Sequence, residues 1–342
     1  GDVEFIPTWY VDDDPATDIY YADVNNPVDL VTEFSYGRLS VDTAAQADSL
    51  VARIIRYEKT PPTENSYYSD ATFISIFQDG SWHWEVNAQG DSIRVDDPPD
   101  GFANRRFSHT SEDVREFLDD SEGYNTERIY RTSNHCWNDN TGDIFPTNWT
   151  TAYWAIFEND SAGGGDSIAA DLLKPGFPWN GNGADMSTAF NNGTFLSLYR
   201  AHGNRGGWFN FGINNVNNLN NGEKRPIIWS PTCQTGWFDH ETDGETETTT
   251  ECFAETWLRH NTGGSVGILA ASRNSSSGQN DRLVWGLTDA IWADFTTTCN
   301  DPYGTDDSFF RLGDVMHYGM DYMSTKYTFG ARKNTLKLFH WF

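Results

Sequence analysis

Short apolar runs separated by polar turns mark the second half of the chain. Residues 194–203, 225–230 and 265–272 have the length and apolar content of buried strands. Residues 252–264 and 281–292 lie between or after them and carry apolar residues at helical spacing. Strands that alternate with helices are typical of a mostly parallel sheet with helices on both faces. The same pattern predicts further strands at 71–77, 126–131 and 336–342 and further helices at 41–59, 111–120 and 308–327.

The helix predicted at 41–59 has a start signal and an apolar face. Asp42 or Thr43 can cap its N-terminus, because their side-chain oxygens can accept a hydrogen bond from the first free backbone N–H groups. Leu50 and Ile54 fall on one face at a spacing of one helical turn. We therefore expect this helix to bury that face against the rest of the protein.

Two stretches interrupt the pattern. The segment "TPPTENS" at 60–66 is rich in proline and polar residues, and it is the best candidate for a linker. Residues 132–185 are rich in Asn, Asp, Gly and Trp, and we interpret them as an irregular insertion. The resulting fold prediction is an α/β protein with a mostly parallel sheet flanked by helices.

The charge balance narrows the classes of partner. The 342 residues include 50 acidic against 23 basic side chains, for a formal net charge of −27. Nucleic acids and anionic membranes favour basic patches, so neither is an expected partner. An acidic surface suits a secreted or cell-surface protein, although simple solubility explains it equally well. The sequence shows neither a signal peptide nor an apolar run near the roughly 18–20 residues of a membrane span.

Four cysteines are present, at Cys136, Cys233, Cys252 and Cys299. None of them forms a C-x-x-C pair, which argues against a structural zinc site. Their wide spacing in a long chain is also untypical of a disulfide scaffold.

A histidine and a cysteine follow two of the predicted strands. His202 and Gly203 end the strand at 194–203, and Cys233 follows the strand at 225–230. The carboxyl ends of adjacent parallel strands lie at one edge of a sheet, so the two side chains are expected to meet. An imidazole can help a thiol become the thiolate that attacks a carbonyl, and can then protonate the leaving amine. A single Cys is otherwise a small buried apolar group or half of a disulfide, and a single His an ordinary surface or core group.

The residues around these two positions resemble a known family. The blocks are similar, in order, to those of gingipain-type cysteine peptidases in the caspase-like clan. A helix, a Gly-rich turn and a strand follow the cysteine block, as in that family. The blocks are "LYRAHGNRGGW" (198–208), "IIWSPTCQTGWF" (227–238), "CFAETWLRHNTGGSVGILAAS" (252–272) and, before them, "TDIYYADV", "YGRLSV" and "ARIIRYEK".

The resemblance implies a caspase-like catalytic subdomain at 67–342, preceded at 1–66 by the C-terminal part of an N-terminal α/β subdomain. It implies Cys233 as nucleophile and His202 as general base and acid. The backbone N–H groups of Gly203 and Cys233 would form the oxyanion hole. The expected activity is that of a secreted cysteine endopeptidase acting on proteins or peptides, with no cofactor required for the chemistry.

The resemblance also implies an acidic residue that orients the histidine, and here the sequence departs from the family. Gln78 occupies the matching place in "FQDG", and Asp79 is beside it. Asp79 could serve after a shift of one residue, the site could act as a Cys–His dyad, or Asp79 could simply form a turn.

The substrate pocket is less clearly indicated. The position that matches the pocket aspartate of arginine-cleaving gingipains lies near Ser108, with Glu112 and Asp113 nearby, so trypsin-like specificity is not supported. Trp208 and Trp237 follow the catalytic positions and either line the pocket or pack in the core.

Calcium is a candidate structural ion, because gingipain-type domains commonly carry it and it binds several carboxylate and carbonyl oxygens. The acidic segments at 11–18 and 239–251 could supply such ligands or could be solvated loops. Two alternatives to the peptidase remain. One is a sortase-like transpeptidase that uses the same acyl-enzyme, and the other is an inactive gingipain-like binding module.

Overall fold

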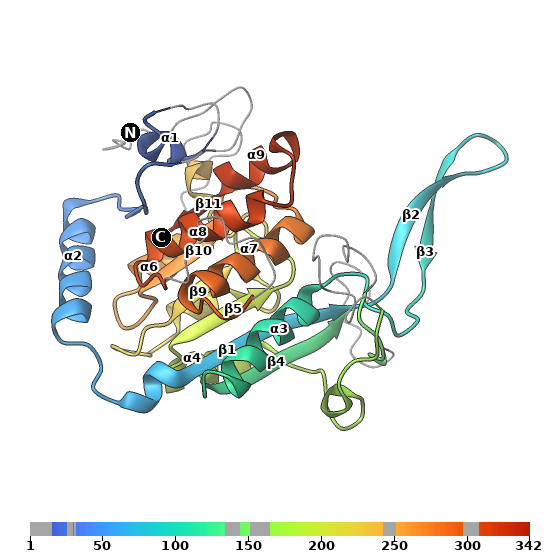
Figure 1. Cartoon of the computed structure of the whole chain (residues 1–342), viewed down its shortest axis with the longest axis horizontal. Coiled ribbons are helices and arrows are strands. Elements are labelled where there is room, and N and C mark those ends of the chain that lie inside the picture. Colours follow the sequence, from blue (N-terminus) through green and yellow to red (C-terminus); the bar gives the residue numbers. More distant parts are fainter. Residues whose placement is uncertain are drawn as a thin grey trace.

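A six-stranded sheet forms the centre of the protein (Figure 1). The structure is a computed structural model, and it describes residues 16–25, 30, 32–133, 144–150, 165–241, 251–296 and 308–342. The strand order is β11-β10-β9-β5-β1-β4, and all neighbours are parallel except β10 and β11. The mostly parallel sheet expected from the sequence is therefore confirmed. Its strands are β1 (Asp70–Gln78), β4 (Asn125–Ser133), β5 (Leu196–Arg200), β9 (Ile227–Ser230), β10 (Gly267–Ala271) and β11 (Phe339–Trp341).

Both faces of this sheet are buried, which explains why its strands are nearly continuous apolar runs. In β1, Phe73 and Phe77 belong to one hydrophobic core, while Ile74 and Ile76 belong to the core on the opposite face. In β10, Leu269 lies in the first core and its neighbours lie in the second. Alternate side chains point to opposite faces of a strand, so a sheet covered on both sides favours apolar residues on both faces, and buried polar residues such as Ser75 and Arg200 are the exceptions.

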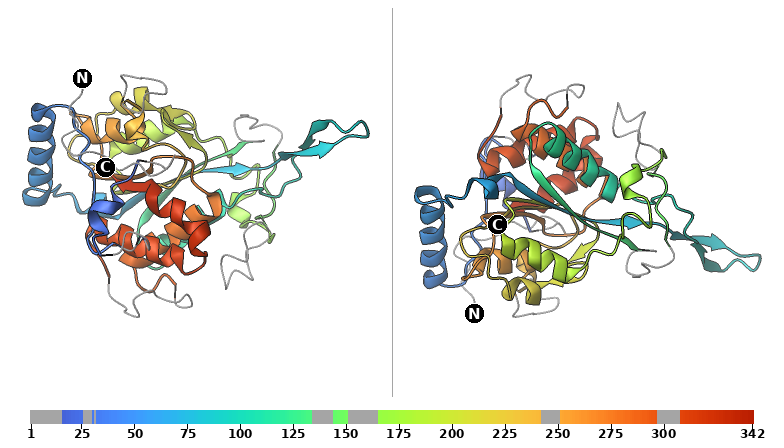
Figure 2. Two further views of the ribbon diagram at one scale, coloured as in Figure 1. Left: turned by 90° about the horizontal axis from the view of Figure 1, so that it is seen from above. Right: turned by 90° about the horizontal axis from the view of Figure 1, so that it is seen from below.

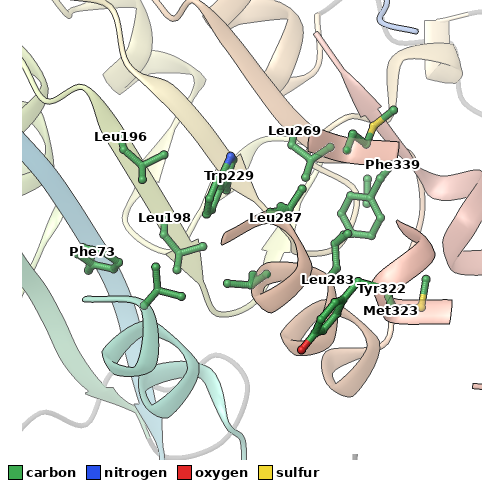
Figure 3. Close-up of a cluster of buried hydrophobic side chains, with 14 of the residues drawn as sticks. Phe73, Leu196, Leu198, Trp229, Leu269, Leu283, Leu287, Tyr322, Met323 and Phe339 are labelled. Carbon is green, nitrogen blue, oxygen red and sulfur yellow. The ribbon is translucent and has the colours of Figure 1, made fainter. Parts of the chain in front are cut away.

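Helices cover each face of the sheet (Figure 2). Leu283 and Leu287 of one covering helix pack toward Trp229 and Leu269 of the sheet (Figure 3). The helices that contribute most side chains to this first core are α3 (Phe107–Asp120), α7 (Ser277–Ile291) and α8 (Leu312–Ser324), and α1 (Ile19–Ala22) and α9 (Phe329–Leu338) add Ile19, Leu336 and Leu338. Those that contribute most to the second core are α4 (Gly183–Asn192), α5 (Ile213–Asn217) and α6 (Phe253–Arg259), and Leu50 and Phe107 add to it from the two helices that precede α4 in the chain.

The helix predicted at 41–59 is α2 (Ala44–Lys59), and it is less buried than its apolar face suggests. Thr43 caps it as expected, because its hydroxyl accepts a hydrogen bond from the Gln46 N–H at 3.2 Å. Leu50 is buried, but Ile54 is 38% exposed. In Figure 1, α2 lies to one side of the sheet, and its Arg53 guanidinium donates to the His260 carbonyl directly after α6 at 3.1 Å.

The segment before α2 packs on the end of the chain. It includes α1 (Ile19–Ala22), and the Asp18 N–H donates to His340 Nε2 at 3.1 Å. Ile19 and Leu30 belong to the first core. The division into subdomains at residue 66 stays a prediction, since nothing here separates two units.

The C-terminal strand is shorter than predicted. Helix α9 (Phe329–Leu338) covers the beginning of the segment predicted as a strand at 336–342, and only β11 pairs with the sheet. Leu336 and Leu338 are buried in the helix, as alternating apolar residues would be in a strand, so this short pattern cannot separate the two structures.

A two-stranded hairpin, β2 (Ser81–Val86) and β3 (Ser92–Asp97), extends from the end of β1 into solvent (Figures 1 and 2) and was not predicted. The irregular insertion predicted at 132–185 overlaps the end of β4 and the start of α4, and its described parts are mainly turns. Smaller elements are η1 (Asn65–Ser69), η3 (Ala170–Leu172), β6 (Gly203–Asn204), β7 (Gly207–Trp208), β8 (Phe211–Gly212) and η4 (Phe238–Glu241). Among the described residues, no helix is both long and apolar enough to cross a membrane.

Candidate active site

Strands β5 and β9 are neighbours, and their carboxyl ends bring the predicted histidine and cysteine to one edge of the sheet. Leu198 pairs with Trp229 in the parallel register. The next residues keep this alignment, because the Thr232 hydroxyl donates to the Ala201 carbonyl at 2.7 Å. The turns that follow β5 and β9 therefore lie side by side, as predicted from the sequence.

Gly203 lies so close to the cysteine turn that no side chain fits there. A Cβ atom at this position would lie 2.7 Å from Thr232 Cγ2 and 3.1 Å from the Cys233 carbonyl oxygen. Real Cβ atoms essentially never approach other heavy atoms within 3.0 Å. The glycine is thus required for the contact between the two turns, whatever its role in chemistry.

His202 is half-buried and is held by neighbouring elements. Its Nε2 lies 2.8 Å from Gln78 Oε1, at the end of β1 on the other side of β5. With the amide oxygen facing the ring, Nε2 carries the proton and Nδ1 carries the lone pair of the neutral imidazole. The Phe107 ring lies edge-on to the imidazole, with the two ring centroids 5.2 Å apart. The Tyr199 hydroxyl donates to the His202 carbonyl at 2.6 Å.

Asp79 does not occupy the position expected of the residue that orients the histidine. Its carboxylate accepts hydrogen bonds from the Asp100 N–H at 3.1 Å and the Gly101 N–H at 2.7 Å. Burial raises the pKa of Asp79, and these backbone donors partly offset the shift. Asp79 therefore closes the base of the hairpin, and Gln78 is the side chain that contacts His202.

Cys233 is half-buried, and its sulfur lies against the loop before α7. The Ser275 N–H lies 3.4 Å from Sγ, and the Ser275 carbonyl oxygen lies 3.6 Å from it. Gln234, directly after the cysteine, has a φ of +61°, so the chain turns sharply at this point. Within the described part of the chain, the Cys233 N–H donates no hydrogen bond.

The residues predicted to line a substrate pocket are placed differently. Ser108 is buried, and its hydroxyl lies 3.2 Å from that of Ser75 beneath the sheet. Trp208 is also buried, stacks on Tyr199 with ring centroids 4.5 Å apart, and donates to the Ser230 hydroxyl. Ser108 therefore lies between α3 and β1, and Trp208 is a core residue because the loop after His202 folds back onto the sheet.

Trp237 is the remaining pocket candidate, and it is half-buried near the cysteine turn. The Arg273 guanidinium lies 4.8 Å from its ring centroid and also forms an ion pair with Asp239 at 2.5 Å. The stacked side chains of Trp237 and Arg273 therefore lie beside the turn that carries Cys233.

The acidic residues near Ser108 belong to the scaffold. Glu112 is buried in ion pairs with Arg115 and Arg128, at 2.9 and 2.7 Å. Asp113 pairs with Arg106 at 2.8 Å, and burial raises the pKa of Asp113 against the influence of that arginine. Their charges are already balanced inside the protein, so neither is available to select a cationic substrate side chain.

The other cysteines differ from Cys233 in environment. Cys252 is completely buried at the start of α6, and burial, with Glu255 adding to it, raises the pKa of its thiol well above the usual value. A buried thiol in this setting is inert. Cys136 and Cys299 lie outside the described residues.

The calcium expectation stays a prediction. Most of the two acidic segments, at 11–18 and 239–251, lies outside the described residues. Among the residues that the structure does describe, no group of three or more His, Cys, Asp or Glu side chains could hold a metal ion.

Sequence reasoning missed the groups that support the two predicted residues. Phe107, Tyr199 and Ser275 come from three distant segments, and only their position in the fold brings them to the site. Tyr199 had one usable signal. A polar tip on an otherwise apolar strand, three residues before a candidate His, has to find a hydrogen-bond partner when buried.

Comparisons with known proteins agree with this fold. The chain is similar to the crystal structure of an Arg-specific cysteine proteinase, gingipain R, with a TM-score of 0.64 and 18% identity over 97% of this chain and 59% of that one. It is also similar to the complex of Porphyromonas gingivalis RgpB pro- and mature domains, with a TM-score of 0.62 and 19% identity over 97% and 60% of the chains. A structure described as a protease matches with a TM-score of 0.56 and 15% identity over 96% and 58%.

These matches confirm the caspase-like α/β fold. The chain spans at most 60% of the length of each of these solved structures. No curated protein matches the chain. The sequence model of peptidase family C25, the gingipain family, matches residues 1–342. The chain therefore belongs to peptidase family C25.

Proposed function

We propose that this protein is a cysteine endopeptidase with Cys233 as its nucleophile and His202 as its general base and acid. The observation that supports this most directly is the contact between two adjacent strand ends. Gly203 lies against Thr232 and Cys233, and the Ala201 carbonyl accepts a hydrogen bond from Thr232. Both reactive side chains are half-buried at this edge, so a substrate can reach them.

In the proposed reaction, His202 takes the proton of the Cys233 thiol, and the thiolate attacks the carbonyl carbon of the scissile peptide bond. The resulting oxyanion collapses, the C–N bond breaks, and the imidazolium gives its proton to the leaving amine. Water then attacks the thioester, with His202 as base, to release the acid product and restore the thiol.

The Cys233 and Gly203 N–H groups are the proposed donors to the oxyanion. The Cys233 N–H suits this role, because it donates no hydrogen bond to the described part of the chain. A preorganised backbone donor of this kind is worth roughly 3–4 kcal/mol in acyl transfer. Gln78 would orient the imidazole, so the site acts as a dyad supported by a neutral amide rather than by a carboxylate.

The test is cleavage of a peptide library by the wild type and by Cys233→Ala, His202→Ala and Cys252→Ala. We expect the first two variants to lose at least about 10³-fold in kcat, as removal of a nucleophile or its base does in related chemistry. Cys252→Ala is the matched control, since it removes a thiol that is buried away from solvent. Cleavage that survives in folded Cys233→Ala would refute the proposal.

The same experiment separates the alternative functions. With an added amine, a transpeptidase yields an amide adduct in place of the hydrolysed product, because both reactions pass through one thioester. An inactive binding module would show no His202-dependent labelling of Cys233 by a thiol-reactive peptide ketone.

We also propose that the protein acts outside the cell or at its surface. The net charge of −27 and the scarcity of basic residues support this location. To test this, the amount of the protein is measured in the culture medium, on washed cells and in the cytoplasmic fraction, with a cytoplasmic marker as control. Confinement to the cytoplasmic fraction would contradict it.

A further inference from the structure

A buried ion pair lies beneath the candidate active site. It joins Arg200, the last residue of β5, to Asp281 in the first turns of α7, and both side chains are 0% exposed. A buried ion pair gains little net stability, because desolvation offsets the attraction between the charges. A role in fixing local geometry explains its presence better than a role in overall stability does.

Arg200 reaches the turn that carries the cysteine. Its Nη1 donates to the Pro231 carbonyl at 2.5 Å, two residues before Cys233. Its Nε donates to Asp281 Oδ1 at 3.0 Å, and its Nη2 contacts the same oxygen. The planar guanidinium has donors in fixed directions, so the carboxylate sets the position of the group that holds Pro231.

Asn280, next to Asp281, holds the same turn from a second side. Its Nδ2 donates to the Pro231 carbonyl at 3.1 Å and to the Ser275 hydroxyl at 2.6 Å. Ser275 is also the residue whose N–H lies 3.4 Å from the Cys233 sulfur. One buried amide thus joins the cysteine turn to the loop that contacts the sulfur.

The ion pair also reaches the histidine. The Arg200 guanidinium carbon lies 5.1 Å from the centroid of the Phe107 ring, and that ring contacts His202 edge-on at 5.2 Å. Arg200 is itself two residues before His202 in the chain. Both reactive side chains are therefore connected to one buried cation through groups that contact each other directly.

We propose that Arg200, Asn280 and Asp281 form a positioning clamp that sets the geometry of Cys233 relative to His202. This inference rests on the proposed function. None of the three residues touches the substrate in this proposal, and they act through the Pro231 carbonyl, Ser275 and Phe107. A displacement of about 1 Å in a catalytic group can reduce a rate by about 10²-fold, so loss of the clamp should reduce catalysis sharply.

The test compares Arg200→Lys and Asn280→Ala with the control Arg115→Lys. Arg200→Lys keeps the charge but loses the planar set of donors. Asn280→Ala removes the amide alone and decides the question if the lysine variant does not fold. Arg115 is a matched control, because it is also buried in ion pairs but contacts Thr126 at the opposite edge of the sheet.

Three readouts are measured for each variant: kcat and KM, the melting temperature, and the pH dependence of Cys233 alkylation by iodoacetamide, followed by peptide mapping. We expect the two clamp variants to lose about 10²-fold in kcat with KM changed less than about threefold. Their Cys233 alkylation near pH 6 should fall to the rate of His202→Ala. Arg115→Lys should lower the melting temperature and leave the other two readouts at wild-type values.

Two outcomes overturn the clamp. The first is wild-type alkylation profiles in the clamp variants, and the second is an equal loss of kcat in Arg115→Lys at the same melting temperature. The alkylation experiment also separates the clamp from the proposed function. If Cys233 is alkylated at the same rate in His202→Ala as in the wild type, the proposed dyad fails and the clamp fails with it. If His202→Ala slows the alkylation of Cys233 but Arg200→Lys and Asn280→Ala keep the profile of Arg115→Lys, only the clamp fails.

Discussion

His202 is held by groups of different chemistry: a neutral amide on Nε2, an aromatic edge on the ring and a phenol on the backbone carbonyl. The neutral amide matters most for chemistry. A carboxylate at the Gln78 position would favour the protonated imidazole, while an amide orients the ring without adding charge. This residue therefore sets the direction of the proposed base without placing a charge beside it.

Replacing Gln78 by glutamate should change the pH dependence of activity. A carboxylate at the place of the Gln78 amide oxygen, 2.8 Å from the ring nitrogen, stabilises the His202 imidazolium. The imidazolium therefore loses its proton only at higher pH. We expect the alkaline limb of the kcat/KM profile to move up by about one pH unit. Gln78→Leu is the control, and it should lower kcat by about tenfold without moving the limb. Identical profiles for Gln78→Glu and the wild type would contradict the contact.

Gly203→Ala tests the close approach of the two turns. The new Cβ would lie 2.7 Å from Thr232 Cγ2, so the turns must separate. We expect kcat/KM to fall by about 10²-fold, measured on a peptide substrate. Gly330→Ala is the matched control, because a Cβ there has no heavy atom within 4 Å. Unchanged activity of Gly203→Ala would show that the two turns can move apart freely.

At the scale of elements, the hairpin β2–β3 and the sheet differ in how they are stabilised. The described side chains of the hairpin are mostly exposed, with Trp84 at 62% and Val86 at 73%. Its base is closed by Asp79 and the backbone at 100–101, which contact each other without the hairpin strands. The hairpin is therefore an appendage of the fold rather than a support for it.

Deleting residues 82–96 and joining the ends with a short Gly-Ser linker should leave the fold intact. No described side chain in this segment belongs to either core, so we expect the melting temperature to change by less than about 4 °C. Asp79→Ala in the full chain is the contrasting variant. It removes the acceptor of two backbone N–H groups and should cost about 1–2 kcal/mol of unfolding free energy. A deletion variant that fails to fold would refute this division.

At the scale of the whole molecule, the N-terminal described segment and the last strand stabilise each other. The Arg38 N–H donates to the Trp341 carbonyl at 2.7 Å, and the Arg38 side chain pairs with Asp18 at 2.8 Å. The Asp18 N–H donates to His340 Nε2, and Nδ1 of the same ring lies 3.0 Å from the Leu338 carbonyl. His340 must be neutral to make both contacts, since Nε2 accepts.

This arrangement predicts a loss of stability in mild acid. Burial lowers the pKa of His340, despite the opposing influence of Asp18 and Asp239, and Arg38 adds to the shift. The stabilising contribution is present above the unfolded pKa of about 6.5 and is lost as pH falls from there toward the folded pKa. We expect the difference in melting temperature between wild type and His340→Gln to shrink from pH 7.5 to pH 5.

His83→Gln is the control for that experiment, because His83 is exposed and pairs with Glu85 and Asp97 on the hairpin. Glu85 and Asp97 raise the pKa of His83, so its contribution is present in acid and is lost as pH rises, the opposite direction to that of His340, and solvent screening keeps it small. The difference in melting temperature between wild type and His83→Gln should therefore not shrink from pH 7.5 to pH 5. A constant difference between wild type and His340→Gln across this range would contradict the buried neutral histidine.

Net charge leads to a second prediction at this scale. Self-repulsion in a chain of charge −27 destabilises the compact state, and salt screens it. We expect the melting temperature to rise between about 10 mM and 500 mM NaCl. Calcium chloride at equal ionic strength should raise it further, because an ion that binds only the folded state adds its own stabilisation. Equal curves for both salts would refute a structural calcium site.

The local pattern was enough to predict the strands of the central sheet, most of the covering helices and the two strand ends that lie side by side. Burial on both faces favours mostly apolar runs such as Phe73–Phe77, in which Ser75 is the one polar residue, and a polar residue soon after such a run lies at the edge of the sheet. For this reason His202 and Cys233 could be paired from the sequence. The hairpin, α4, α5 and α9 were missed. An exposed ribbon has no core-facing pattern, α4 and α5 are short helices in segments rich in Asn and Gly, and a short alternation also fits a helix.

The tertiary structure decided which side chains meet across long sequence separations. Whether Gln78 or Asp79 faces His202 depends on the register of β1 beside β5, since a shift of one residue reverses the side-chain direction. Trp208 was a pocket candidate by position but stacks in the core. Arg200 and Asp281 are ordinary charges in the sequence and become a buried pair only when α7 packs across β5. Local sequence determines period and burial, while these contacts depend on strand order and helix placement.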